Sequence, residues 1–216
     1  MTPPGAAVTI RHCDFGAVGA ERTFGEICDI YEASIPASER KDRDGLRHMT
    51  RRDDYRFLVA EDAGRVLAFA VVYRSAAEPV SLLEYLATAP QARNRGIGGR
   101  LLDQAIAGEA GRPVLLEVET PPPGTDGGLE VRRVDFYRRH NARIVDRFAY
   151  LLPLKANGMP PPMNILVAGA PDLREIPAET FRRWIADIYE NVYATAAGGG
   201  AFAAMFGGGP AAYTLL

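Results

Sequence analysis

The stretch from Pro90 to Leu102, PQARNRGIGGRLL, combines arginines and glycines in a pattern that suits an anionic ligand. Glycines let a backbone approach a ligand closely, and the amides of a helix's first turn have no acceptor within the helix. The helix dipole adds about half a positive charge at the same end. A phosphate or pyrophosphate group is therefore the expected ligand, with full charges from Arg93, Arg95 and Arg100.

Two other phosphate motifs compete for this segment. A P-loop is excluded because Gly98-Gly99-Arg100 is not followed by the Lys-Ser/Thr pair that the motif requires. A dinucleotide fingerprint stays open, since Glu117 and Glu119 follow Gly96 by about twenty residues, where that motif has a ribose-binding acid. Its third glycine would, however, be Leu101, and the long basic turn before Gly96 favours a pyrophosphate held by a curling loop.

The motif Arg93-Asn94-Arg95-Gly96-Ile97-Gly98 resembles the R/Q-x-x-G-x-G/A coenzyme A signature of the GNAT superfamily of acyltransferases. The segment LLEYLATAP resembles the splayed fourth strand of that family, and RRVDFYRRHNAR resembles its helix carrying Phe-Tyr. This resemblance covers residues 20–170. It predicts an α/β (α+β) fold with a mixed, mostly antiparallel central sheet, flanked by helices, whose splayed fourth strand binds coenzyme A. The predicted domains are a GNAT acetyltransferase domain at 1–170 and a C-terminal helix with a Gly/Ala-rich tail at 171–216.

The resemblance implies an N-acetyltransferase that moves an acetyl group from the cosubstrate acetyl-CoA to a primary amine of a small molecule or protein, by direct transfer in a ternary complex. It implies no metal. The residues expected to bind coenzyme are Leu86, Ala87, Thr88, Arg93, Asn94, Arg95, Gly96, Ile97, Gly98, Gly99 and Arg100. Two alternatives remain: an acyl-CoA-binding regulatory module without transferase activity, and a transferase that uses a longer acyl-CoA.

Acyl transfer to an amine needs a base for the amine and an acid for the departing thiolate. The resemblance implies that Glu84, in mid-strand, is the general base, acting through water; its alternative role is an ion pair with a nearby arginine. Tyr137 aligns with the general-acid tyrosine of the family; its alternative role is that of a core aromatic residue. A phenol with a pKa of about 10 can protonate a thiolate whose conjugate acid has a pKa of about 8.5.

Several other residues are assigned no catalytic role, and two depart from the family pattern. Asn141 stands where many members have a glycine, and asparagine tolerates the left-handed backbone there. Glu130 stands where many members have an asparagine that touches the coenzyme, so the resemblance does not supply this contact. The residues without a predicted role in catalysis are His12, His48, Cys28 and the helix-end His140.

Hydrophobic periodicity predicts the elements that position these residues. Strands are expected at 7–13, on both sides of the Ala63-Gly64 turn, and at 81–88, 113–119, 142–153 and 163–170. Helices are expected at 24–33, 99–108, 129–140 and 177–193. The last helix has an apolar face, packed on the domain or on a second subunit as in a homodimer, and formed by Phe181, Trp184 and Ile188. The Gly/Ala-rich tail from Ala194 is expected to be mobile or to need a partner.

Composition limits the partners and the compartment. The net charge is −2 and the pI is near 6.0, so the chain lacks the excess positive charge that attracts nucleic acids. No nucleic-acid partner is expected. Two cysteines, Cys13 and Cys28, are too few for a disulfide framework, and no basic leader or long apolar run appears. A cytoplasmic protein without a membrane partner is expected. Acidic residues at 32–54 interleave with basic ones, which favours a solvated surface over a site for a cationic amine.

Overall fold

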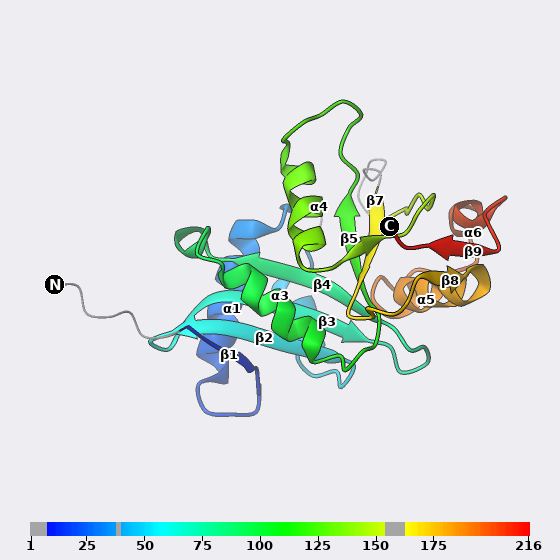
Figure 1. The fold of residues 1–216 in the computed structure, drawn as a ribbon. Helices are drawn as coiled ribbons and strands as arrows, with labels where there is room; N and C mark the ends of the chain where they lie inside the picture. Colours follow the sequence, from blue (N-terminus) through cyan, green and yellow to red (C-terminus); the bar gives the residue numbers. More distant parts are fainter. Residues whose placement is uncertain (1–7, 38–39, 154–162) are drawn as a thin grey trace. The chain divides into compact units, whose positions relative to one another are not determined.

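The computed structural model describes residues 8–37, 40–153 and 163–216. The chain divides into two compact units, each of which collects segments that are distant in the sequence. The first unit comprises Met1–Arg74 and Leu83–Gly108, and the second comprises Ser75–Leu82 and Glu109–Leu216. Strand β4 (Ser81–Thr88) therefore begins in the second unit and continues in the first. Figure 1 shows the course of the chain.

The first unit is built on the hairpin that the sequence predicts. Strands β2 (Tyr55–Asp62) and β3 (Arg65–Arg74) pair antiparallel, and β1 (Thr9–His12) pairs antiparallel with β2. The turn residues Ala63 and Gly64 have φ angles of 48° and 74°, which two-residue hairpin turns require. Most side chains of β3 are buried, so this strand lies at the centre of the unit's core.

Two helices cover the hairpin of the first unit. Helix α1 (Ala20–Ser34) and helix α3 (Ile97–Ala107) both pack on β3. Each buries the apolar face that its helical spacing predicts, and Cys28 lies in the core as expected. A short 3-10 helix, η2 (Pro90–Ala92), links β4 to the segment before α3.

Helix α2 (Arg43–Met49) lies in a stretch whose local pattern is only polar, although the family resemblance includes a pair of helices there. Asp42 caps this helix, because its side chain accepts a 2.7 Å hydrogen bond from the amide of Gly45. Leu46 and Met49, three residues apart, are its buried contacts. The cap and this pair place the preceding residue, Lys41, at a defined point beside α1.

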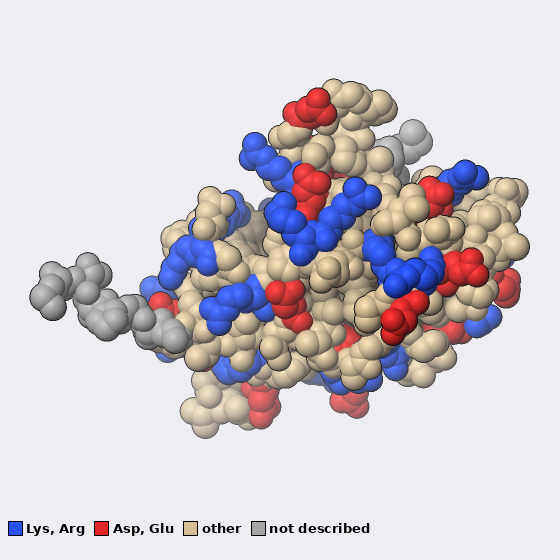
Figure 2. Space-filling model, in the orientation of Figure 1, with Lys and Arg blue, Asp and Glu red and all other residues tan. Residues whose placement is uncertain are grey.

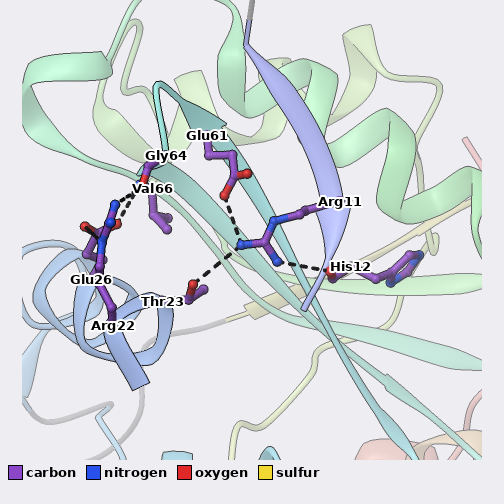
Figure 3. Close-up of polar contacts among 8 residues, drawn as sticks. All are labelled: Arg11, His12, Arg22, Thr23, Glu26, Glu61, Gly64 and Val66. Carbon is purple, nitrogen blue, oxygen red and sulfur yellow. Dashed lines mark hydrogen bonds and ion pairs between the residues drawn. The ribbon is translucent and has the colours of Figure 1, made fainter. Parts of the chain in front are cut away.

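Polar contacts fasten α1 to the hairpin turn, as Figure 3 shows. Glu26 accepts a 2.8 Å hydrogen bond from the amide of Val66 and forms a 3.2 Å ion pair with Arg22. Arg22 also donates to the carbonyl of Gly64 at the turn. These contacts hold α1, which carries Tyr31, at a fixed position on the strands.

The second unit has its own group of strands. β5 (Val114–Glu119) pairs antiparallel with β7 (Met163–Ala168), which pairs antiparallel with β6 (Arg143–Ile144). The first residues of β4 pair parallel with β5 on its other side, which confirms β5 as a central strand. The sheet has seven strands in the order β1-β2-β3-β4-β5-β7-β6. It is mixed and mostly antiparallel, as predicted.

The predicted strand over 142–153 is wrong for most of its length. Only Arg143 and Ile144 belong to β6, and beyond them Val145 and Tyr150 form isolated bridges. Arg147 has a φ of 54°, a left-handed conformation that interrupts an extended strand. After this turn Phe148 and Tyr150 are buried among aromatic residues instead of continuing the sheet.

The C-terminal segment is more structured than its Gly/Ala-rich composition suggests. Helix α5 (Ala178–Asn191) follows β8 (Glu175–Pro177), and α6 (Gly200–Phe206) is followed by β9 (Ala212–Thr214), which pairs with β8. The expected apolar face of α5 is buried within the chain. The burial that composition alone does not reveal comes from a cluster of aromatic rings, Phe148, Phe181, Phe202, Phe206 and Tyr213. None of the helices in the described ranges is long and apolar enough to cross a bilayer.

Candidate active site

The predicted phosphate loop joins β4 to α3 in the first unit. The chain leaves β4 at Thr88, turns through η2 and reaches α3 by two residues in the left-handed conformation, Asn94 (φ 60°) and Gly96 (φ 72°). Gly96 is the N-cap residue of α3 and has no side chain to accept hydrogen bonds from the first-turn amides. The amides of the first turn therefore receive no hydrogen bond from a capping side chain.

The three arginines of this loop are exposed and carry uncompensated charge. Arg93 donates to the Thr88 carbonyl (3.4 Å) and to Ser34 (3.5 Å), and Arg100 donates to the carbonyl of Val8 (3.1 Å). None of the three forms an ion pair with a carboxylate among the residues that the structure describes. The loop thus presents three guanidinium groups at a positive helix end, which suits a pyrophosphate.

Gly98 has a steric reason to be glycine. A Cβ atom added at this position would lie 3.1 Å from Oγ1 of Thr88, closer than most side-chain contacts. The first turn of α3 therefore lies close to the end of β4, and a side chain here would push the two apart. The fixed distance keeps the first-turn amides beside the strand residues Leu86, Ala87 and Thr88.

Glu84 is a buried carboxylate that pairs with a lysine. Its side chain is 3% exposed, and Oε1 lies 2.5 Å from Nζ of Lys41. Oε2 is buried and accepts no hydrogen bond from any part of the chain that the structure describes. The alternative to a catalytic role was an ion pair between Glu84 and a nearby arginine. The partner of Glu84 is instead a lysine, Lys41, from the segment before α2. A buried carboxylate with one unsatisfied oxygen costs stability unless it serves a ligand.

Tyrosine rings surround this ion pair. The rings of Tyr31 and Tyr85 meet edge-to-face with centroids 5.0 Å apart, and Nζ of Lys41 lies 5.8 Å from the centroid of Tyr85. The hydroxyl of Tyr31 accepts a 2.8 Å hydrogen bond from the amide of Lys41. Burial, reinforced by the negative charge of Glu84, raises the pKa of Tyr55 and of Tyr85 far above the ordinary value. The rings beside this ion pair are an environment that favours a cation.

Sequence reasoning missed Lys41 and these tyrosines. One signal was present: 25 residues are lysine or arginine, and only Lys41 and Lys155 are lysines. Lysine is the basic residue that can lose its proton and act as a nucleophile. The position of Lys41 beside Glu84 does not follow from local spacing, because the two residues are 43 positions apart.

A hollow in the first unit lies away from the predicted coenzyme residues. It has a volume of about 780 Å³ and contains none of the predicted coenzyme residues. Tyr55, which is affected by the charge of Glu84, is part of its wall, and so is Cys13. Burial raises the pKa of Cys13 to about 12, so this thiol is protonated and unreactive at neutral pH.

Tyr137 belongs to the second unit, on α4 (Leu129–Arg139). Tyr137 is half-buried, no residue of α4 is fully buried, and basic side chains gather over this helix in Figure 2. Burial of the phenol raises the pKa of Tyr137 to about 12, against the opposing charge of Arg133. Its hydroxyl therefore carries a proton at neutral pH, as a general acid must. As expected, His140 caps the end of this helix and Asn141 adopts a φ of 61°.

The two acidic residues of the dinucleotide alternative are occupied. Both oxygens of Glu117 accept hydrogen bonds, Oε1 from the hydroxyl of Tyr150 and Oε2 from that of Tyr193. Glu119 forms a 3.3 Å ion pair with Arg133. Neither carboxylate is presented to a ribose, so the geometry does not favour the dinucleotide alternative. The described part of the chain contains no cluster of His, Cys, Asp or Glu that could hold a metal ion.

Comparison with known proteins agrees with this geometry. Residues 53–141 match the family model of the acetyltransferase (GNAT) domain. No curated protein sequence matches the chain. A solved structure from Bacteroides thetaiotaomicron, assigned to the GNAT family of acetyltransferases, is 23% identical with a TM-score of 0.69, over 87% of this chain and 99% of that chain.

Two further solved structures have a similar fold and more specific descriptions. The ribosomal-protein-S18-alanine N-acetyltransferase of Escherichia coli is 15% identical with a TM-score of 0.55, over 75% of this chain and 93% of that chain. An aminoglycoside 6'-N-acetyltransferase complexed with coenzyme A is 19% identical with a TM-score of 0.57, over 74% of this chain and 95% of that chain. At these identities the likeness concerns the fold.

Proposed function

Because the chain carries an acetyltransferase domain of the GNAT family, we propose that it transfers an acetyl group from acetyl-CoA to a primary amine within a ternary complex. The observation that carries this proposal is the buried carboxylate of Glu84, which pairs with an ammonium group that lies over the ring of Tyr85. An amine acceptor must arrive as an ammonium ion and lose a proton before it can attack, and this arrangement supplies a binding site and a base for that step.

The coenzyme is proposed to bind at the end of β4. Its pyrophosphate would take the first-turn amides of α3 and the guanidinium groups of Arg93, Arg95 and Arg100. The pantetheine amides would pair with the backbone of Leu86, Ala87 and Thr88, in the manner of an added strand. This arrangement accounts for the left-handed Gly96 and the crowded Gly98.

The proton transfers are assigned to two residues. Glu84 takes a proton from the acceptor ammonium, and the amine then attacks the thioester carbonyl. As the carbon–sulfur bond breaks, Tyr137 gives its proton to the thiolate. The raised pKa of Tyr137 keeps this proton in place until the thiolate forms. Both roles rest on the environment of each residue and on the family pattern.

The acceptor is proposed to be a cationic amine of a small molecule or peptide. Aromatic rings and a buried carboxylate recognise an ammonium group better than a neutral ligand. The solved structures with this fold include enzymes that act on an aminoglycoside and on a ribosomal protein, which agrees with both acceptor types. Two cysteines without a disulfide fit a reducing cytoplasm.

Calorimetric titration with acetyl-CoA tests the coenzyme site. We expect micromolar binding by the intact chain and none by the Arg95→Ala/Gly98→Asp variant, because this variant loses a charge and blocks the first turn of α3. Arg65→Ala, which removes an exposed arginine from the hairpin, is the matched control and should bind normally. Absence of binding by the intact chain would overturn the proposal.

Amine turnover separates a transferase from a regulatory module. Release of the coenzyme A thiol is followed with a panel of aminoglycosides, polyamines and peptides. Acetyl-CoA binding together with turnover of at least one cationic amine supports the transferase. Binding without turnover of any amine supports the acyl-CoA-binding module, and faster turnover with a longer acyl-CoA supports the donor alternative.

A further inference from the structure

Lys41 occupies the place beside Glu84 that an acceptor amine would take. Its Nζ lies 2.5 Å from Oε1 of Glu84, within direct hydrogen-bond reach of the base. The Lys41 side chain is 29% exposed, against 3% for Glu84, so its amine lies where the buried carboxylate meets the surface of the unit. The first unit therefore already places a primary amine against its own proposed base.

Contacts of both the backbone and the side chain hold Lys41 in this position. Its backbone amide donates to the hydroxyl of Tyr31 (2.8 Å), and Asp42, the next residue, caps α2. Its ammonium lies over the ring of Tyr85 as well as against Glu84. Holding an amine and a base together makes proton transfer intramolecular, which is the largest advantage that a bound acceptor gains.

We propose that Lys41 is an acetyl acceptor of the chain's own active site, an inference that rests on the proposed function. Glu84 removes a proton from the Lys41 ammonium, and the neutral amine attacks the carbonyl carbon of acetyl-CoA. A carbon–nitrogen bond forms, the carbon–sulfur bond breaks, and the coenzyme A thiolate takes up a proton. The products are N-acetyl-Lys41, coenzyme A and one proton released to solvent. No further reactant is needed.

This modification changes the site that it occurs in. Acetyl-lysine is neutral, so the positive charge that balances the buried carboxylate of Glu84 is lost. A buried carboxylate without a cation is strongly unfavourable, and a cationic acceptor can then take the place of the lysine ammonium. Self-acetylation would thus convert an occupied amine site into one that selects positively charged acceptors.

The chain contains its own control, because Lys155 is its only other lysine. The full chain is incubated with acetyl-CoA alone, and acetylation of both lysines is followed by peptide mass spectrometry. We expect Lys41 to be acetylated at least about tenfold faster than Lys155, since it is held against a base. The fraction modified per minute should not depend on protein concentration, because the reaction is intramolecular.

Two variants separate catalysis from chemical acetylation. Glu84→Gln keeps the shape of the side chain and should slow acetylation of Lys41 by about 100-fold or more, with no change at Lys155. Lys41→Arg keeps the positive charge and should show modification only at Lys155. Circular dichroism melting of both variants verifies that they are folded.

The outcomes distinguish this inference from the proposed function. Equal rates at the two lysines, or a rate per molecule that rises with protein concentration, would overturn self-acetylation. If Lys41 stays unmodified while acetyl-CoA binds and an added amine is acetylated, self-acetylation is wrong and the proposed function stands. If acetyl-CoA does not bind in calorimetry, both are wrong.

Discussion

Two carboxylates, Glu84 on β4 in the first unit and Glu117 on β5 in the second, have contrasting surroundings. Both lie in mid-strand beside tyrosines. Glu117 accepts tyrosine hydroxyls on both oxygens. Glu84 pairs with an ammonium on one oxygen, and its other oxygen is buried without a hydrogen bond from the described residues. The same residue type thus pairs with two phenols in one unit and with a lysine ammonium in the other.

This difference shows how the surroundings of a carboxylate decide its use. Hydrogen bonds from the buried Tyr150 and the half-buried Tyr193 hold Glu117 in one orientation and stabilise its charge, so it contributes to the fold. The lysine that pairs with Glu84 is partly exposed, which is why we propose that a substrate ammonium can take its place. A buried acid in a strand is therefore not by itself evidence of catalysis.

The largest expected effect distinguishes the two carboxylates directly. Glu84→Gln should lower kcat for amine acetylation by about 100-fold or more, because an amide cannot take the proton of the ammonium. Glu117→Gln should keep kcat within about threefold of the unmodified chain and lower the free energy of unfolding by about 1–3 kcal/mol. Steady-state kinetics and urea denaturation measure the two quantities. A large loss of kcat in Glu117→Gln, with an unchanged kcat in Glu84→Gln, would make Glu117 the functional acid.

A second pair of variants compares two tyrosine hydroxyls, those of Tyr137 and Tyr150. Tyr137 donates to no other described side chain, whereas the hydroxyl of Tyr150 is committed to Glu117. Tyr137→Phe should lower kcat by about 100-fold and leave the calorimetric Kd for acetyl-CoA unchanged, since only the proton donor is lost. Tyr150→Phe should leave kcat unchanged and destabilise the chain by about 2 kcal/mol. Unchanged turnover in Tyr137→Phe would remove this residue from the mechanism.

The smallest expected effect is a pH dependence of the stability that Tyr150 contributes through its contact with Glu117. Burial, reinforced by Glu117, raises the pKa of Tyr150 well above its ordinary value, whereas an unfolded tyrosine titrates near about 10. Above that pH the unfolded chain loses the proton and the folded chain keeps it, so stability contributed by Tyr150 falls as pH rises. The stability difference between the unmodified chain and Tyr150→Phe should therefore shrink between about pH 9 and 11. A difference that is constant in urea denaturation across this range would contradict the raised pKa.

Most elements and the phosphate loop could be predicted from the sequence because their signals are local. Apolar runs on both sides of the Ala63-Gly64 turn mark β2 and β3, helical spacing marks α1, α3 and α5, and the glycines between β4 and α3 mark a loop that approaches an anion. The prediction of a long strand over 142–153 failed because the left-handed turn at Arg147 carries no glycine or proline signal. The tail was underestimated because its few aromatic rings are buried together, which composition does not show.

By itself the sequence predicted the resemblance to GNAT acyltransferases, the order of most elements and the loop that suits a pyrophosphate, since these depend on local motifs and local periodicity. Only the tertiary structure decided what surrounds each acid. Lys41 reaches Glu84 from 43 residues away, and Tyr193 reaches Glu117 from 76 residues away. Side-chain charge and hydrogen bonding depend on neighbours in space, so the partner of each carboxylate follows from packing and not from local spacing.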